Sequence, residues 1–176
     1  MVYRSEFVEW VPFPLEHVFL FFANPENLPR IMPPARDTRI EGLKLVFPPS
    51  LSGSTSVPLA GVGSEIITSF RLAPPLPIRR RWIARVTEFE WNHHFADIQI
   101  QGPFKAWLHR HELTPETRNR VNGTVVRDRI EYEIGFGVLG GIAQTLFVSR
   151  QMRSTFTHRQ RVLEELLSHT EFEGTV

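Results

Sequence analysis

Seven segments of the chain have the pattern of β-strands, with apolar and polar residues alternating and Gly, Pro or Asn at their ends. The first segment, YRSEFVEW, covers residues 3–10 and ends before two closely spaced prolines. Strands that follow one another directly along the chain usually pair antiparallel. The remaining six segments are 38–47, 61–70, 79–90, 94–101, 103–113 and 123–134.

Helical spacing of apolar residues occurs near both ends of the sequence. Residues 14–23, PLEHVFLFFA, have this spacing, and the proline that opens them suits a first helical turn. Asn24 and Pro25 end that helix, and residues 25–32 predict a short second one. From about residue 142 to residue 167 the spacing returns, which predicts a helix about 39 Å long.

The order of these elements predicts an α+β fold. A long amphipathic helix that follows an antiparallel sheet buries its apolar stripe against one face of the sheet. We therefore expect a curved antiparallel sheet wrapped around a long C-terminal helix, with two short helices after the first strand and a cavity between sheet and helix. The Pro-, Ser- and Gly-rich residues 48–61 predict a mobile loop, which is expected to gate the mouth of the cavity near residues 50–62. Residues 114–123 are expected to be a hairpin connection that ends in Asn122-Gly123.

Polar and aromatic side chains share one face of two neighbouring predicted strands. The stretch GPFKAWLHRHEL at residues 102–113 puts an indole and two imidazoles at every second position. A three-residue turn at 102–104 would align this row with a polar row of the preceding strand. A two-residue turn would place the rows on opposite faces, but we prefer the three-residue turn because it matches polar rows. The two rows are Asp97 with Gln99, and Trp107 with His109 and His111.

The last predicted strand indicates which face is inward. Its residues alternate between a charged row, expected to face water, and a mostly apolar row that contains Asp128 and Tyr132. A buried carboxylate needs a partner, and His109 or His111 on the neighbouring strand is the obvious one. The opposite arrangement stays open, because a second row is equally apolar and would put the histidines outside if it faced the core. That row is Ala96, Ile98, Ile100, Phe104, Ala106 and Leu108.

Composition and charge exclude several classes of function. The chain has 176 residues, a formal net charge of +1 and no Cys. The near-neutral charge gives no basic surface for nucleic acid, and the absence of Cys excludes disulfides, thiolate metal sites and a Cys nucleophile. No apolar run reaches the ~18 residues of a membrane span, and the N-terminus lacks a secretory-signal pattern. We expect one domain over residues 1–176, located in the cytoplasm, with its oligomeric state open.

Four arginines of the long helix are expected on a solvated face by default. They are Arg150, Arg153, Arg159 and Arg161.

Four stretches of the chain resemble the START-like, or SRPBCC, superfamily. They are WVPFPLEHVFLFFANPENLP, FADIQIQGPFKAWLHRHEL, GTVVRDRIEYEI and the closing helix with RSTFTHRQRVLEELL. The second is the most specific, because it joins an aromatic-Asp-Gln strand, a Gly-Pro-Phe turn and a Trp-His-His strand. The resemblance implies a helix-grip fold with an internal cavity for an apolar ligand. It does not imply one reaction, because this fold serves carriers, cyclases, hydrolases and co-chaperones.

We expect the chain to bind a hydrophobic or aromatic small molecule between the sheet and the long helix, without a cofactor. The first alternative is an enzyme similar to polyketide cyclases and dehydratases, with His109, His111, Asp128 and Tyr132 supplying a His–Asp acid/base pair. The second is a protein-interaction module similar to co-chaperones. The expected ligand-binding residues are Asp97, Gln99, Trp107, His109, His111, Asp128, Tyr132 and Phe156.

Two other kinds of site are less well supported by the sequence. The His-x-His spacing of His109 and His111 suits metal chelation, and Glu116 follows after a short gap. However, Pro115 places that Glu in a turn and no third His is well placed, so we expect a hydrogen-bonded pair and no metal. A serine hydrolase is not indicated, because no Gly-x-Ser-x-Gly motif is present.

Overall fold

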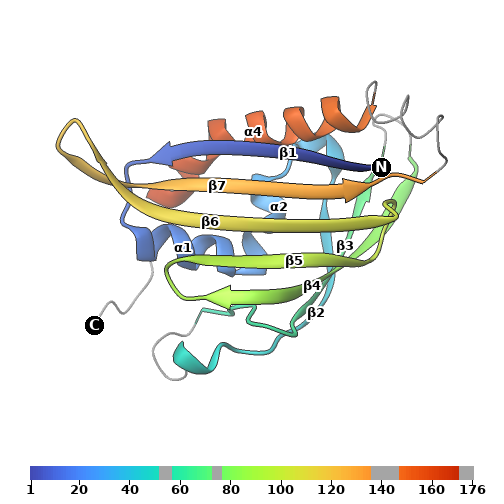
Figure 1. Ribbon diagram of the computed structural model, residues 1–176, viewed down its shortest axis with the longest axis horizontal. Coiled ribbons are helices and arrows are strands. Elements are labelled where there is room, and N and C mark those ends of the chain that lie inside the picture. Colours follow the sequence, from blue (N-terminus) through green and yellow to red (C-terminus); the bar gives the residue numbers. More distant parts are fainter. Residues whose placement is uncertain (52–56, 73–76, 136–146, 171–176) are drawn as a thin grey trace.

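A seven-stranded antiparallel sheet forms the larger part of the fold. The computed structural model describes residues 1–51, 57–72, 77–135 and 147–170. The strands follow the order β1-β7-β6-β5-β4-β3-β2 across the sheet (Figure 1). Their bounds are β1 Val2–Val11, β2 Arg39–Lys44, β3 Glu65–Arg71, β4 Arg79–Glu90, β5 His94–Gln101, β6 Ala106–Arg118 and β7 Val121–Glu133.

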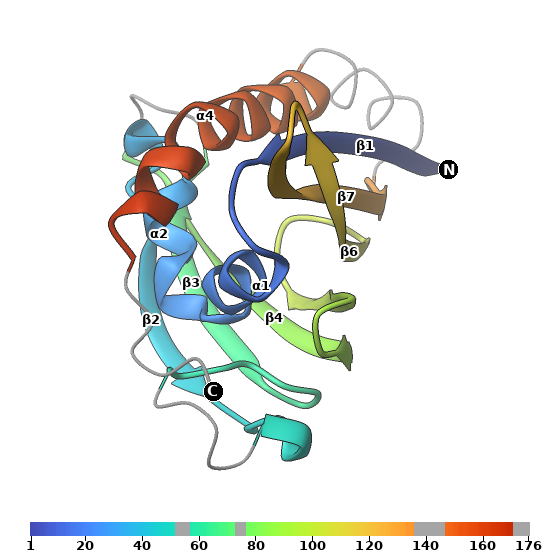
Figure 2. The same cartoon turned by 90° about the vertical axis from the view of Figure 1, so that its left-hand side faces the viewer.

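The helices lie on the concave side of this sheet. The sheet curls around α1 and α2, and α4 runs beside β1 (Figure 2). None of the helices in the described part of the chain is long and apolar enough to cross a bilayer. The arrangement confirms the predicted α+β fold, with short helices after the first strand and a long helix near the C-terminus. The helices are α1 Leu15–Ala23, α2 Leu28–Ile31 and α4 Ser149–Ser168, with 3₁₀ turns η1 Pro25–Asn27, η2 Pro34–Arg36 and η3 Pro49–Leu51.

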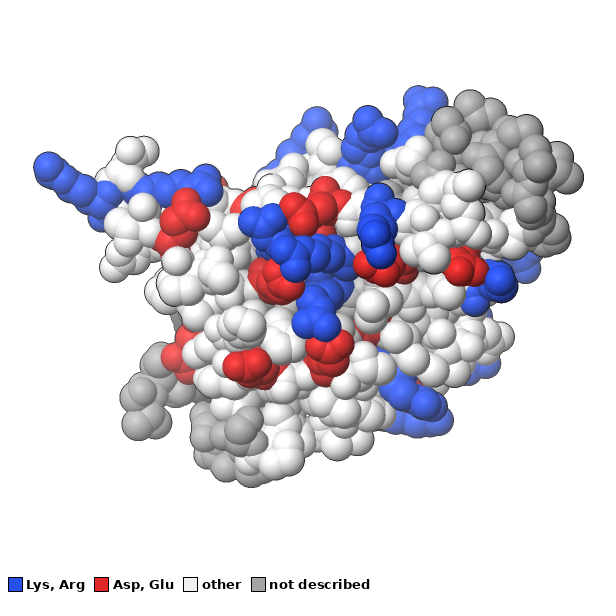
Figure 3. All heavy atoms as spheres, in the orientation of Figure 1, with Lys and Arg blue, Asp and Glu red and all other residues white. Residues whose placement is uncertain are grey.

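Charged side chains cover the convex face of the sheet in alternating signs (Figure 3). Glu6 on β1 pairs with Arg127 and Arg129 on β7, at 2.7 and 3.1 Å. Arg110 on β6 pairs with Glu88 on β4 at 2.6 Å. Such exposed pairs add little to stability. They do establish that the charged row of β7 faces water, as its alternation predicts, so the opposite row faces the concave side.

The turn between β6 and β7 differs from the prediction. β6 continues to Arg118 and β7 begins at Val121, so the connection is the two residues Asn119 and Arg120, with φ values of 50° and 66°. Two left-handed residues suit the twist of a tight hairpin. The predicted connection over 114–123 is therefore wrong. Gly123 serves close packing instead, because a Cβ there would lie 2.4 Å from the Val11 carbonyl oxygen.

Two other predicted segments lie partly outside the described residues. Within the predicted helix over 142–167, residues 142–146 lie outside the described part, residues 147 and 148 form a short π-helical turn, and α4 begins at Ser149. Residues 52–56 of the predicted loop at the cavity mouth also lie outside the described part of the chain. The described ends of this loop are anchored, because Leu51 and Leu59 are buried in the hydrophobic core.

The helix α4 is tied to the sheet by a buried cation. Its apolar face includes Phe156 and Leu163, and Arg159 lies three residues after the first and four before the second, so it shares that face. Its side chain is only 4% exposed. It forms ion pairs with Glu9 on β1, at 2.5 Å, and with Asp128 on β7. The default expectation of a solvated Arg159 is therefore wrong.

Burial and the charge of Arg159 act in opposite directions on the pKa values of the two carboxylates beside it. Burial by itself would raise the pKa of Asp128, but Arg159 and two nearby histidines hold that pKa well below its usual value. Burial outweighs the attraction of Arg159 at Glu9 and raises the pKa of its carboxyl. Asp128 therefore stays ionised inside the protein because Arg159 is there.

We predict that Arg159→Met lowers the free energy of unfolding by about 3–5 kcal/mol, because it leaves Asp128 and Glu9 buried without a cation. Urea unfolding followed by circular dichroism measures the change. The matched control is Arg153→Met, which removes an exposed arginine from the same helix and should change stability by less than about 0.5 kcal/mol. Equal, small losses in both variants would contradict the anchoring role of Arg159.

Candidate functional site

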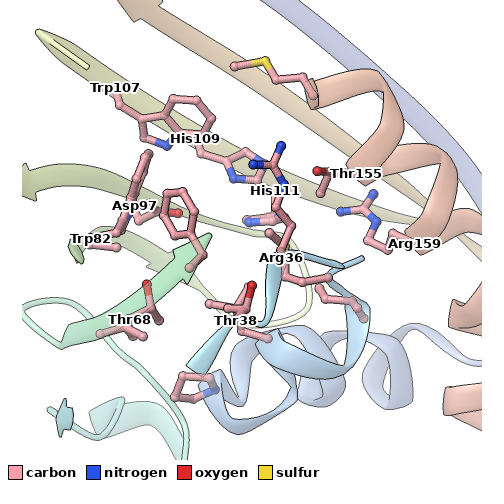
Figure 4. Close-up of a pocket in the computed structure, with 18 of the residues that line it drawn as sticks. Arg36, Thr38, Thr68, Trp82, Asp97, Trp107, His109, His111, Thr155 and Arg159 are labelled. Atoms are coloured by element: carbon pink, nitrogen blue, oxygen red, sulfur yellow. The ribbon is translucent and has the colours of Figure 1, made fainter. Parts of the chain in front are cut away.

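A cavity of about 470 Å³ lies between the concave face of the sheet and the helices α1, α2 and α4. Its wall is mainly apolar and aromatic (Figure 4). Side chains from α1, β4, β6 and α4 meet there, for example Phe22, Trp82, Trp107 and Phe156. The curvature of the sheet keeps α4 from packing against every strand, and this separation creates the space.

Three aromatic rings form one side of the cavity. The ring centroids of Trp82 and Trp107 are 5.0 Å apart and nearly perpendicular. The ring of Phe104 lies 5.0 Å from that of Trp107 and 5.8 Å from that of Trp82. Both contacts of Trp82 are edge-to-face and the Phe104–Trp107 contact is tilted, and together they fix the rings against one another. They present a preformed aromatic surface to the cavity.

Strand register brings the polar residues to the same wall. Asp97 on β5 is directly opposite His109 on β6, and His111 on β6 is directly opposite Asp128 on β7. This is the register that a three-residue turn at 102–104 predicts. His109 and His111 line the cavity and so face the concave side, whereas Ile100 of the competing apolar row is 44% exposed.

Asp128 orients both histidines from behind. The Nε2 of His109 lies 2.9 Å from the Asp128 Oδ1 atom and forms a hydrogen bond with it. The Nδ1 of His111 lies 2.7 Å from the same oxygen, at an angle that is poor for a hydrogen bond. An ionised carboxylate only accepts, so each ring carries its proton on the nitrogen that faces Asp128. In the neutral form, the other nitrogen of each ring keeps its lone pair.

The titration behaviour of the site follows from its burial. Burial lowers the pKa of His111 to about 4, with the neighbouring His109 acting in the same direction. Burial likewise raises the pKa of Asp97 to about 6, opposed by His109. Among the described residues Asp97 has no hydrogen-bond or ion-pair partner, although its side chain lines the cavity. The carboxyl of Asp97 is thus a polar group that is available to whatever occupies the cavity.

The predicted ligand-binding residues divide into two groups. Five line the cavity, and three lie behind its wall. The five are Asp97, Trp107, His109, His111 and Phe156, and the three are Gln99, Asp128 and Tyr132.

Those three residues support the wall. Gln99 donates from Nε2 to the Phe104 carbonyl at 2.8 Å and accepts from the Phe104 N–H, which holds the turn between β5 and β6. Tyr132 is 1% exposed and packs behind the rings of Phe104 and Trp107. Asp128 fixes the histidines. The sequence pattern predicts which side chains face inward, but it does not distinguish a side chain that lines the cavity from one that lies behind the lining.

Most residues that line the cavity were not among the predicted ligand contacts, and Arg36 and Trp82 are two examples. Arg36 in η2 reaches the cavity wall and donates from Nη1 to the Leu72 carbonyl at 2.6 Å. Gln151 on α4 donates to the same carbonyl at 2.9 Å, so this contact joins η2 and α4. Nothing in the local sequence around Arg36 indicates such a position. Trp82 does have a signal in the sequence. It alternates with Ala84 and Val86 along β4, which indicates one shared face, and all three line the cavity.

Solved structures with the same fold span nearly the whole chain. A START superfamily protein from Mycobacterium smegmatis has a TM-score of 0.64 at 14% identity, over 94% of this chain and 97% of that one. The protein TTHA0849 from Thermus thermophilus has a TM-score of 0.62 at 19% identity, over 94% and 97%. Norcoclaurine synthase from Thalictrum flavum, in complex with dopamine and hydroxybenzaldehyde, has a TM-score of 0.61 at 14% identity, over 97% and 90%. At these identities the likeness shows the fold alone.

Sequence comparison gives the family. No curated protein sequence matches the chain at a significant level. The family model described as "Polyketide cyclase / dehydrase and lipid transport" matches residues 11–161, which include every lining residue named above. The chain therefore belongs to the polyketide cyclase/dehydrase and lipid transport family of START-like proteins.

Proposed function

We propose that the chain binds a hydrophobic or aromatic small molecule in the cavity between the sheet and α4. The observation that carries this proposal is the cavity itself, about 470 Å³ with a mainly apolar wall. Pockets for small molecules typically measure about 300–1,000 Å³ and combine apolar walls with a few converging polar groups. Asp97 and His109 supply such groups on one wall.

The aromatic rings support a flat or aromatic ligand in particular. Trp82, Phe104 and Trp107 hold one another in place, so a ligand can stack on them without first ordering the site. Norcoclaurine synthase, which shares the fold, was solved with the aromatic compounds dopamine and hydroxybenzaldehyde. The family description names both cyclases and lipid transport.

A second candidate function is that of a cyclase or dehydratase. The observation that favours it is the His109 ring, which Asp128 orients from behind so that its second nitrogen remains available at the cavity wall. An imidazole held in this way can accept a proton from a bound substrate. Asp97 lies on the facing strand as a second group for proton transfer.

We predict that protein purified from its expression host releases a small apolar molecule on unfolding, because a largely apolar cavity of this size favours an apolar occupant over water. Native mass spectrometry, compared with a spectrum of the denatured protein, detects it. Protein that is empty and shows no thermal shift with aromatic, polyketide and quinone-like compounds would contradict the proposal and favour an interaction module.

We also predict that Ala84→Phe blocks binding. Ala84 lines the cavity on β4, so a phenyl ring there takes up space that the ligand needs and weakens binding by at least about 10-fold. Isothermal titration with a compound from the panel measures this. The control is Ile83→Phe, which adds bulk on the opposite face of the same strand and should leave affinity unchanged. Equal affinities in the two variants would place binding elsewhere.

His109→Ala separates the two candidate functions. If the chain only binds its ligand, this variant should lose about 10-fold or less in affinity, as for one hydrogen-bonding group. The ligand should then be recovered unchanged after incubation with wild-type protein, as judged by mass spectrometry. Time-dependent conversion that is present in the wild type and lost in His109→Ala would instead establish the enzyme.

A further inference from the structure

Three groups that can bind a metal converge on the cavity wall. Asp97, His109 and His111 each offer one ligand atom, and these atoms lie within 4.8 Å of one another. Figure 4 shows Asp97 reaching toward the two imidazoles from the neighbouring strand. The cluster is built into the sheet, because Asp97 pairs with His109 in the β5–β6 register and His111 follows on the same face.

The chemistry of this cluster calls for a cation. Asp128 accepts a hydrogen bond from His109 and lies 2.7 Å from the Nδ1 of His111, so in the neutral rings the nitrogen that faces Asp128 carries the proton and the other nitrogen has only a lone pair. The third group, Asp97, is a carboxyl without a hydrogen-bond or ion-pair partner in the described part of the chain. Three acceptors that face one another without a donor are unfavourable. A bound metal ion would satisfy all three.

The surroundings match those of known metal sites. A histidine that ligates a metal usually donates its other ring N–H to a carboxylate or carbonyl, which fixes the tautomer and the orientation. Asp128 has this position behind both rings, and Arg159 holds Asp128 in turn. The tautomer and the orientation of both rings are therefore already fixed in the metal-free protein.

We propose that Asp97, His109 and His111 form a binding site for a divalent transition-metal ion such as Zn²⁺. Two imidazole nitrogens and one carboxylate oxygen suit such ions, and three protein ligands leave a coordination position open toward the cavity. Zinc–nitrogen bonds of about 2.0–2.1 Å place ligand atoms about 3.3 Å apart. Small rotations of the three side chains are therefore enough to close the site.

This site differs from the one that the sequence suggested and then rejected. Glu116 is at the exposed end of β6, where its carboxylate pairs with Arg118 at 2.6 Å, so it does not join the histidines. The third ligand comes from the neighbouring strand instead. That pairing depends on strand register, which the sequence alone left as a choice between two turns.

A second cluster, at the turn between β4 and β5, provides a control. Glu90, His93 and His94 also bring ligand atoms within 4.8 Å, but Glu90 and His93 are exposed. The Nδ1 atoms of its two histidines lie 2.8 Å apart and contact each other. A double variant, His93→Ala with His94→Ala, removes this surface cluster and leaves the cavity intact.

The test is titration of chelator-treated, full-length protein with Zn²⁺ by isothermal calorimetry, in the absence of any organic ligand. We expect one equivalent to bind to the cavity site. Asp97→Ala and His109→Ala should each weaken that binding by more than about 100-fold, since loss of an outer-shell partner alone typically costs about 10–100-fold. The His93→Ala/His94→Ala variant should bind as the wild type does. Co²⁺ absorption in the visible range gives an independent readout of the same ligands.

Three results would overturn the proposal: no stoichiometric Zn²⁺ binding, binding that survives Asp97→Ala, or binding that is lost only in the His93→Ala/His94→Ala variant. Circular dichroism checks that each variant folds, and Asp97→Asn replaces Asp97→Ala if the alanine variant does not. The substitution removes the carboxylate charge at nearly constant shape, so it too must weaken binding. Because no organic ligand is present, failure here leaves the hydrophobic-ligand proposal untouched, and the reverse also holds.

Discussion

The buried charge of Arg159 is the interaction on which the rest of the site depends. It holds α4 against β1 and β7 through Glu9 and Asp128. It also keeps Asp128 ionised in a position where water does not reach, and an ionised Asp128 in turn decides which nitrogen of His109 and His111 carries the proton. A single cation on the helix thus determines how two imidazoles on the sheet present themselves to the cavity.

The same constraint explains why polar groups are tolerated next to an apolar space. Burying a lone carboxylate costs several kcal/mol unless it is paired, and the protein pairs Asp128 with a cation and two rings. Asp97 differs, because no such partner is present in the described residues and its pKa is raised to about 6 by burial. The protein therefore pairs the carboxylate behind the wall, Asp128, and leaves the carboxylate on the wall, Asp97, for a ligand, a proton or a metal ion.

Much of the fold could be predicted from local patterns, because strand alternation and helical spacing are properties of neighbouring residues. The inward row of Asp128 and Tyr132 follows from the charged residues between them. The β6–β7 turn could not be predicted in this way, since Gly123 resembles a turn residue but serves packing against Val11. The polarity of Arg159 favours a solvated face, whereas its place between Phe156 and Leu163, a spacing that the sequence does contain, indicates the buried one. Arg36 gives no comparable signal, because its position depends on how η2 meets the end of β3.

The positions of the imidazole protons of His109 and His111 can be measured directly. Nitrogen-15 NMR of the imidazole rings distinguishes the two tautomers and the doubly protonated ring, and His109→Ala and His111→Ala variants assign the signals. At about pH 8, above the ordinary titration range of histidine, we expect His109 protonated at Nε2 only and His111 at Nδ1 only. A proton on the cavity-facing nitrogen of either ring would contradict the claim that Arg159, through Asp128, directs both lone pairs toward the cavity.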